Sequence, residues 1–124
     1  KDYFGPRAME NADEVNALLE DIYAGFKNQL GISVSMRTRL AIQDYVSAGA
    51  VVFTGESEPA YRTAIDFAVV QRLMPSIDGN GKEYRERLEA MQSIFDGNGL
   101  DRSRTELAEL IERGEKSMGW YRFF

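Results

Sequence analysis

The sequence contains no cysteine and no histidine, and these two absences exclude several classes of protein. Without cysteine there is no disulfide framework, no thiolate nucleophile and no Cys/His zinc site. Without histidine there is no imidazole to act as a general base near neutral pH. Paired carboxylates could support acid–base chemistry, but no pair stands out among the 20 acidic residues. We therefore assign no catalytic residue and no metal ligand.

The chain also lacks an excess of positive charge and a long apolar segment. Fifteen Lys and Arg stand against 20 Asp and Glu, so the formal net charge is −5. A protein that binds nucleic acid directly usually carries a basic surface, and this class is disfavoured. No apolar run approaches the roughly 20 residues of a membrane span, and the first residues do not resemble a signal peptide. We expect a cytoplasmic chain without direct nucleic-acid or membrane contacts.

What the chain does contain is typical of one globular domain over residues 1–124, with 44% hydrophobic and 28% charged residues. Apolar residues recur with a helical period in residues 11–30, between a capping pair, Asn11 and Glu14, and a terminating Gly31. Similar patterns predict further helices over residues 35–48, 57–74, 82–95 and 103–114.

Turn residues set the expected limits of these helices. Gly49 ends the second helix, and residues 50–53 are either a loop or an extension of that helix. The third helix begins with Ser57, Glu58 and Pro59, ends at Pro75 and is apolar on most sides, so we expect it at the centre of the domain.

The last helix is bounded by two further signals. Ser103 and Glu106 form a second capping box at its start, and Gly114 ends it. The sequence DGNG occurs twice, at 78–81 and 96–99, and each copy is predicted to be a turn between helices. Neither copy has the ligand spacing of a calcium loop, and the first also lacks the glycine and hydroxyl residues of a phosphate-binding loop.

Together these segments predict an all-α fold, a compact bundle of five helices with a short extended C-terminal segment packed back on it. That segment is rich in aromatic residues: Trp120, Tyr121, Phe123 and Phe124. At the end of an acidic domain, packing in the core or at an interface is favoured over stacking on bases. One interpretation is therefore a free-standing interaction module that binds a protein through this tail and the third helix.

Arg37 supports a different interpretation. It falls in the first turn of the second helix, just after Ser35, where backbone amides and a guanidinium can together bind phosphate. By pattern alone a surface arginine is the simpler explanation.

Three segments make the chain resemble a known family: VSMRTR at 34–39, AIDFAVVQRLMPSI at 64–77 and LDRS at 100–103. With these segments the chain is similar to the C-terminal helical lid of AAA+ NTPases of the McrB-like and MoxR-like groups, which occur in modification-dependent restriction systems. The second segment is the most specific, because it matches in its apolar order, its Gln-basic pair and its terminating proline.

The resemblance implies that Arg37 is the sensor-2 arginine, with Arg39 as the alternative, and that it links hydrolysis to lid rotation in DNA restriction or phage defence. It implies ATP or GTP with Mg in the full-length protein and no cofactor held by this chain alone. The chain has no Walker A loop, no Walker B strand and no assignable arginine finger, so these are expected upstream of Lys1, in a core of which this chain is a C-terminal fragment. The implied partners are that core, neighbouring subunits of a ring and a nuclease subunit.

Overall fold

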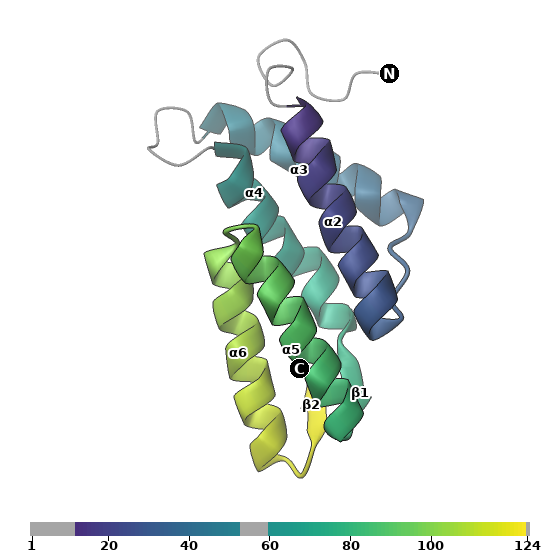
Figure 1. Ribbon diagram of the computed structural model, residues 1–124. Coiled ribbons are helices and arrows are strands. Elements are labelled where there is room, and N and C mark those ends of the chain that lie inside the picture. Colours follow the sequence, from purple (N-terminus) through teal and green to yellow (C-terminus); the bar gives the residue numbers. More distant parts are fainter. Residues whose placement is uncertain (1–11, 53–59, 124) are drawn as a thin grey trace.

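The computed structural model describes residues 12–52 and 60–123, and it confirms the predicted all-α fold (Figure 1). The predicted capping residue Asn11 and the predicted helix start at 57–59 lie outside the described residues. The helices are α2 (Ala12–Leu30), α3 (Met36–Val52), α4 (Ala60–Ala68), α5 (Lys82–Gly97) and α6 (Asp101–Lys116).

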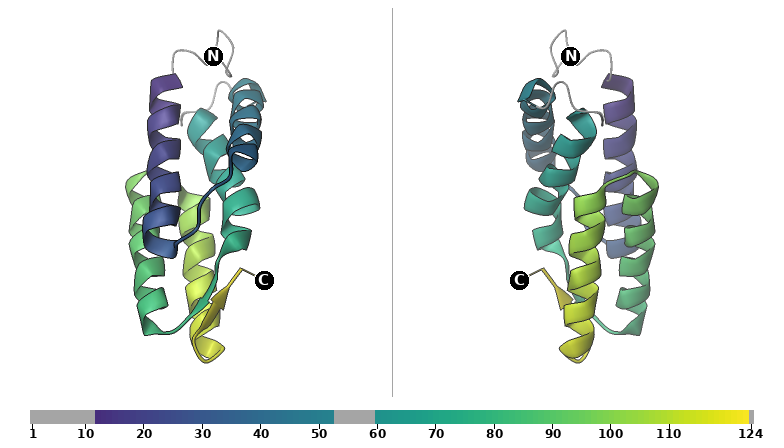
Figure 2. Two further views of the ribbon diagram at one scale, coloured as in Figure 1. Left: turned by 90° about the vertical axis from the view of Figure 1, so that its right-hand side faces the viewer. Right: turned by 90° about the vertical axis from the view of Figure 1, so that its left-hand side faces the viewer.

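The helices form a bundle that α3 crosses near one end. Helices α2, α4 and α6 run in the same sense and α5 runs against them, as the two side views also show (Figure 2). Helix α4 contacts α2, α3 and α6. The prediction that the third helix is central is therefore confirmed.

One hydrophobic core joins the five helices of the described residues and the C-terminal segment. Phe26 of α2 and Phe95 of α5 are fully buried, and their ring centroids lie 6.3 Å apart with the planes tilted by 48°. Burying a side chain of this size contributes about 2–3 kcal/mol. The other fully buried large residues are Leu19, Ile22, Ile42, Ile65, Met74, Ile77, Leu88, Met91, Leu100 and Leu107.

The predicted ends of the second and third helices differ from the structure. Helix α3 continues past Gly49 to Val52, so the helix extension is the correct alternative for the described part of residues 50–53. Helix α4 is prolonged by a π-helical turn, η2 (Val69–Leu73), and a 3-10 turn, η3 (Met74–Ser76). Pro75 therefore lies inside a helical turn instead of ending the helix, because the first positions of such a turn need no amide donor.

The start of α6 was also predicted wrongly. The helix begins at Asp101, and the Ser103 side chain does not cap it as a box with Glu106. The carboxylate of Asp66 in α4 caps it instead. Its Oδ1 accepts hydrogen bonds from the Ser103 amide (2.7 Å) and hydroxyl (2.6 Å), and its Oδ2 accepts one from the Arg102 amide (2.8 Å). The cap comes from a residue more than 30 positions away in sequence, so a local motif could not reveal it.

The expected end of α6 at Gly114 was wrong for a similar reason. The helix continues to Lys116, and Gly114 is buried inside it. A Cβ at this position would overlap the ring of Tyr121, which packs directly on the Gly114 backbone. Gly114 is required for this close approach and does not mark a helix end.

The C-terminal segment is extended, as predicted, and forms a strand, β2 (Trp120–Arg122). Its partner is β1 (Asp78–Asn80), which pairs with it antiparallel in the register Gly79 opposite Tyr121. The first DGNG copy is therefore a strand and not only a turn. The second copy ends α5 and turns toward α6 with Gly99 at φ 72°, as predicted.

Candidate functional site

The beginning of α3 contains the two predicted phosphate-binding residues, Arg37 and Arg39. Ser35 caps this helix, since its Oγ accepts a hydrogen bond from the Thr38 amide at 3.2 Å and lies 3.0 Å from the Thr38 hydroxyl. The first turn contains no acidic residue. Its partial positive charge is therefore not balanced by a carboxylate of its own turn.

Arg39 is occupied by contacts within the domain. Its Nε donates to the carbonyl of Val34 (3.1 Å), and its Nη1 lies 3.5 Å from a carboxylate oxygen of Glu20. The guanidinium carbon lies 4.4 Å from the centroid of the Tyr23 ring, within the range of a cation–π contact. Arg39 therefore joins the start of α3 to α2.

Arg37 differs from Arg39 in each of these respects. It is exposed, and it makes no hydrogen bond or ion pair with any residue that the structure describes. Its neighbour Met36 is 68% exposed, which is unusual for a large apolar side chain. The first turn of α3 thus presents a free guanidinium beside an uncovered apolar side chain.

Tyr23, which lies beneath Arg39, is a buried phenol with an unsatisfied hydroxyl. Its side chain is 4% exposed, and its Oη has no hydrogen-bond partner among the described residues. Burial raises the pKa of Tyr23 from 10.0 to about 12, although the nearby Arg39 charge acts in the opposite direction.

We expect the Tyr23→Phe variant to be more stable than the wild type by about 1 kcal/mol at pH 7, because it removes a buried polar group that lacks a partner. The protonated phenol is favoured by the fold. The wild type therefore keeps its full stability below about pH 10. It loses stability as the pH rises from 10 toward 12, because the unfolded chain ionises Tyr23 before the folded one does. Urea unfolding at pH 7 and at pH 11 should show that the difference in the free energy of unfolding between Tyr23→Phe and the wild type is larger at pH 11. Burial also raises the pKa of Tyr84, so part of the alkaline loss should persist in the variant. A smaller difference in the free energy of unfolding at pH 11 than at pH 7 would contradict the raised pKa of Tyr23.

The predicted aromatic tail is divided between surface and core. Trp120 is 48% exposed and Phe123 is half-buried, whereas Tyr121 is only 4% exposed and belongs to the core of the domain itself. Phe124 lies outside the described residues. The alternation follows from the strand, because neighbouring side chains of β2 point to opposite faces.

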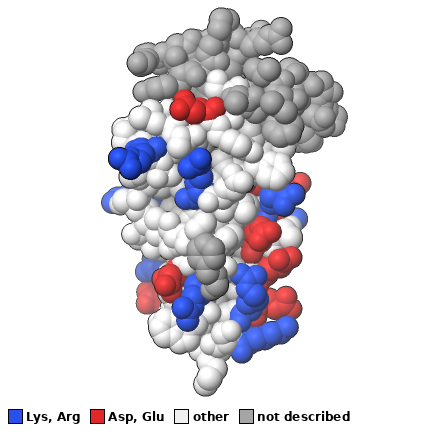
Figure 3. All heavy atoms as spheres, turned by 180° about the vertical axis from the view of Figure 1, so that it is seen from behind, with Lys and Arg blue, Asp and Glu red and all other residues white. Residues whose placement is uncertain are grey.

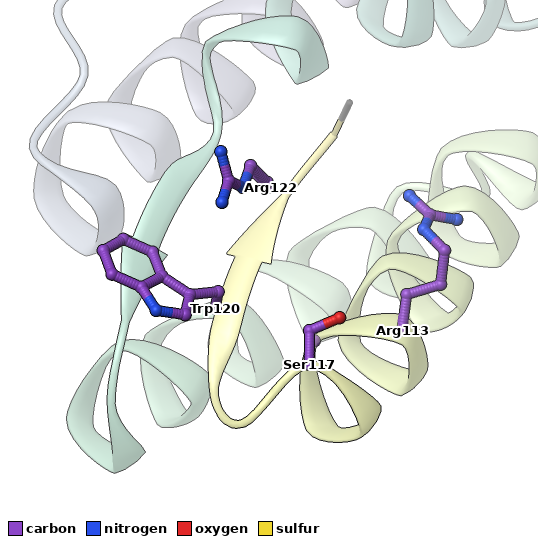
Figure 4. A pocket seen from close by; sticks show the side chains of 5 residues that line it. Arg113, Ser117, Trp120 and Arg122 are labelled. Carbon is purple, nitrogen blue, oxygen red and sulfur yellow. The ribbon is translucent and has the colours of Figure 1, made fainter.

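A pocket of about 320 Å³ lies between the last turns of α6 and strand β2 (Figure 4). Arg113, Gly114 and Ser117 line it from the helix, and Trp120 and Arg122 line it from the strand. Figure 4 shows Arg113 and Ser117 on the α6 side of β2, with Trp120 and Arg122 on the other side in that view.

The surface around this end of the molecule is mixed in charge. Seen from behind the view of Figure 1, Lys and Arg side chains lie among Asp and Glu over the lower half of the molecule (Figure 3). Arg85 near the end of the bundle is paired with Glu115 at 2.7 Å, for example. The two arginines of the pocket have no such carboxylate among the described residues. Arg113 Nη2 donates to the Phe123 carbonyl at 3.3 Å, and the Arg122 guanidinium lies 5.5 Å from the Trp120 ring centroid.

Two of the segments on which the family resemblance rests meet in space. Asp66 belongs to the segment 64–77, and the amides that it binds belong to the segment 100–103. The Arg102 guanidinium also lies 4.5 Å from the centroid of the Phe67 ring. No local sequence pattern indicates this role of Asp66, because its partners lie 36 and 37 residues away. Its position suggests that these segments primarily maintain the packing of α4 against α6.

The profile of a family described as "Domain of unknown function (DUF8727)" matches residues 1–119. The chain belongs to this family. A search of curated proteins and a search of solved structures each found no match. The family description names no activity, so only the contacts of its own residues bear on the function of this DUF8727 domain.

The described residues of this DUF8727 domain show neither a metal-binding cluster nor a membrane-spanning helix. They contain no group of three or more acidic side chains arranged to hold a metal ion. No helix among them is both long and apolar enough to span a membrane.

Proposed function

We propose that this chain is the helical lid of a ring-forming AAA+ NTPase, in which Arg37 reaches the phosphates of a nucleotide held by an α/β core. The observation that carries the proposal is the contrast between the two candidate arginines. Arg39 is held by Val34, Glu20 and Tyr23, whereas Arg37 is exposed and unpaired among the described residues. Of the two, only Arg37 can contact an external anion without first breaking contacts within the domain.

The surroundings of Arg37 support this role physically. The start of a helix attracts anions through its free amides and its dipole, and a guanidinium adds a permanent charge with two parallel donors. The exposed Met36 beside it supplies apolar surface that a core domain would cover.

Hydrolysis of the nucleotide would then be transmitted through this contact. The γ-phosphate leaves on hydrolysis, so an arginine that binds it is released, and the lid can rotate relative to the core. Ser35 fixes the first turn of α3, and Arg39 ties that turn to α2, so a movement of Arg37 would carry the bundle with it. In a restriction or phage-defence system, such a cytoplasmic lid would link ATP or GTP state to contacts with neighbouring subunits and with a nuclease.

The test is made on the full-length protein. The gene upstream of the codon for Lys1 should encode a glycine-rich loop ending in Gly-Lys-Ser or Gly-Lys-Thr, followed by an acidic strand. In that protein, Arg37→Ala should lower the NTPase rate by at least about tenfold, because an ionic contact to the phosphates is lost.

Two variants serve as controls for Arg37→Ala. Arg72→Ala removes another exposed arginine, in η2, and should leave the rate unchanged. Arg39→Ala should lower the thermal stability of the chain, which Arg37→Ala should not do. An upstream region without a phosphate-binding loop, or a wild-type rate in Arg37→Ala, would overturn the proposal.

A further inference from the structure

Among the described residues, strand β2 pairs with β1 along one edge and with no strand along the other. The Phe123 amide donates to the Ile77 carbonyl at 3.3 Å, and the Gly81 amide donates to the Gly119 carbonyl at 3.1 Å. Directly opposite residues of an antiparallel pair alternate between hydrogen-bonded and non-hydrogen-bonded pairs. These two bonds make residues 119 and 123, on either side of β2, hydrogen-bonded positions. By alternation, Tyr121 between them is the hydrogen-bonded position within the strand.

Trp120 and Arg122 therefore occupy the non-hydrogen-bonded positions, and their backbone groups point away from β1. The Trp120 amide donates to the Ser117 carbonyl within the turn, at 3.4 Å. The carbonyl of Trp120 and both backbone groups of Arg122 have no backbone partner among the described residues. Such an edge is a template for another extended chain.

The free edge of β2 faces a groove rather than a flat surface. The pocket of about 320 Å³ lies along this edge, and the last turns of α6 form its other wall through Arg113, Gly114 and Ser117 (Figure 4). The Tyr121 ring packs on the Gly114 backbone, so the strand lies close to the helix at this wall of the groove. A groove between a helix and an edge strand has the shape that binds an extended peptide as an added strand.

The charge of the groove selects the kind of peptide. Elsewhere in the described part of the chain, four arginines have a carboxylate within 4.0 Å: Arg39, Arg85, Arg87 and Arg104. Arg113 and Arg122 have none among the described residues, and the same is true of Arg37, Arg72 and Arg102. Asp78 lies opposite Arg122 in the sheet register but forms no ion pair with it. Arg113 and Arg122 both line this one pocket, and two cations without an ion pair to a described carboxylate favour an acidic ligand.

We propose that the groove between α6 and β2 binds an extended acidic segment of a partner protein, which adds as a third strand to the free edge of β2. Every second side chain of the added strand would lie on the outer face, beside Arg122 and Trp120. The side chains between these would lie on the α6 side, near Arg113. The exposed Trp120 ring offers apolar contact to the first set. The proposal does not depend on the nucleotide role of Arg37, because β2 lies at the end of the bundle away from α3 (Figure 1).

The test begins with a display library of random nine-residue peptides selected on the full chain of 124 residues. Enriched peptides should be rich in Asp and Glu and should lack proline in their central positions, because each central amide is needed for pairing. The most enriched peptide, labelled with a fluorophore, is then titrated by anisotropy. The same peptide with alternate backbone amides N-methylated should bind at least about tenfold more weakly, since strand addition relies on those donors.

Variants of the chain separate charge from backbone pairing. Arg122→Gln and Arg113→Gln should each weaken binding about threefold, as expected for an exposed ion pair. Arg122→Pro should abolish binding without disturbing the β1 pairing, because the Arg122 amide points away from β1. Arg72→Gln removes an exposed charge elsewhere and should change nothing.

Several results would overturn the proposal. These are a failure to enrich any peptide, enrichment of basic or uncharged peptides, equal binding of the N-methylated peptide, or unchanged binding by Arg122→Pro. A dimer in sedimentation equilibrium that Arg122→Pro converts to a monomer would assign the edge to a second copy of the chain instead.

Discussion

Replacing Asp66 with alanine is expected to lower the free energy of unfolding by about 2–4 kcal/mol, enough to unfold a marginally stable domain of this size in mild denaturant. The carboxylate accepts the amides of Arg102 and Ser103 and the Ser103 hydroxyl, at 2.6–2.8 Å, and it is nearly fully buried. Alanine would leave the Arg102 and Ser103 amides without their acceptor and the Ser103 hydroxyl with only the Asp66 backbone carbonyl, 3.3 Å away, and would detach the start of α6 from α4. Urea unfolding followed by circular dichroism measures the loss.

A control in the same turn distinguishes this cap from a general effect of negative charge. Asp101 is exposed in the first turn of α6, so Asp101→Ala should cost only about 0.3–1 kcal/mol through the helix dipole. The loss of unfolding free energy in Ser103→Ala should lie between those of the two aspartate variants, because this change removes the hydroxyl donor and leaves both amides bound to Asp66. Similar losses for Asp66→Ala and Asp101→Ala would show that the contact between α4 and α6 does not depend on this carboxylate.

Gly114→Ala is expected to destabilise the chain by about 1–3 kcal/mol, although alanine is the better helix former by about 1 kcal/mol. The added Cβ would overlap the ring of Tyr121, which is attached to β2 and cannot simply rotate away. The strand should therefore separate from α6, and the fluorescence of the neighbouring Trp120 should report the change. Thermal unfolding measures the loss of stability.

Gly97→Ala is the matched control for Gly114→Ala. Gly97 is the last residue of α5, and a Cβ there meets no atom within 4 Å, so this variant should be as stable as the wild type or slightly more stable. The cause can also be tested by a double-mutant cycle. If the Tyr121 ring is the obstacle, Gly114→Ala combined with Tyr121→Ala should cost less than the sum of the single variants. Equal stability of the two single glycine variants would exclude the clash.

The two glycine-to-ring contacts explain why the C-terminal sheet could not be predicted. Tyr121 packs on Gly114, and the Tyr84 ring lies so close to Gly79 that a Cβ at Gly79 would be 2.5 Å from it. The two tyrosine rings lie 6.5 Å apart between centroids, and the two strands pair above them. Each glycine looks like a turn or a helix end in sequence, because the ring that requires it comes from elsewhere in the chain.

In the candidate sites, too, features set by neighbouring residues could be predicted and features set by distant segments could not. The position of Arg37 in the first turn of α3 was predicted from the sequence, because Ser35 caps the helix through a residue three positions away. The sequence made Arg37 the candidate and kept Arg39 as the alternative. What separates them in the structure is the contacts of Arg39 with Glu20 and Tyr23 of another helix. The free edge of β2 was also not foreseen, because its existence depends on pairing with residues about 40 positions earlier.

The apolar spacing of the chain was therefore sufficient to define five helices, their central member and the extended tail. Helical periodicity and caps within one turn act over at most a few residues, so they can be read from adjacent letters. The tertiary structure decided the start and end of α6, the strand in the first DGNG copy, which arginine is free and where the charged groove lies. Each of these depends on a carboxylate, a ring or a backbone edge supplied by a distant segment, whose position is fixed only when the core packs.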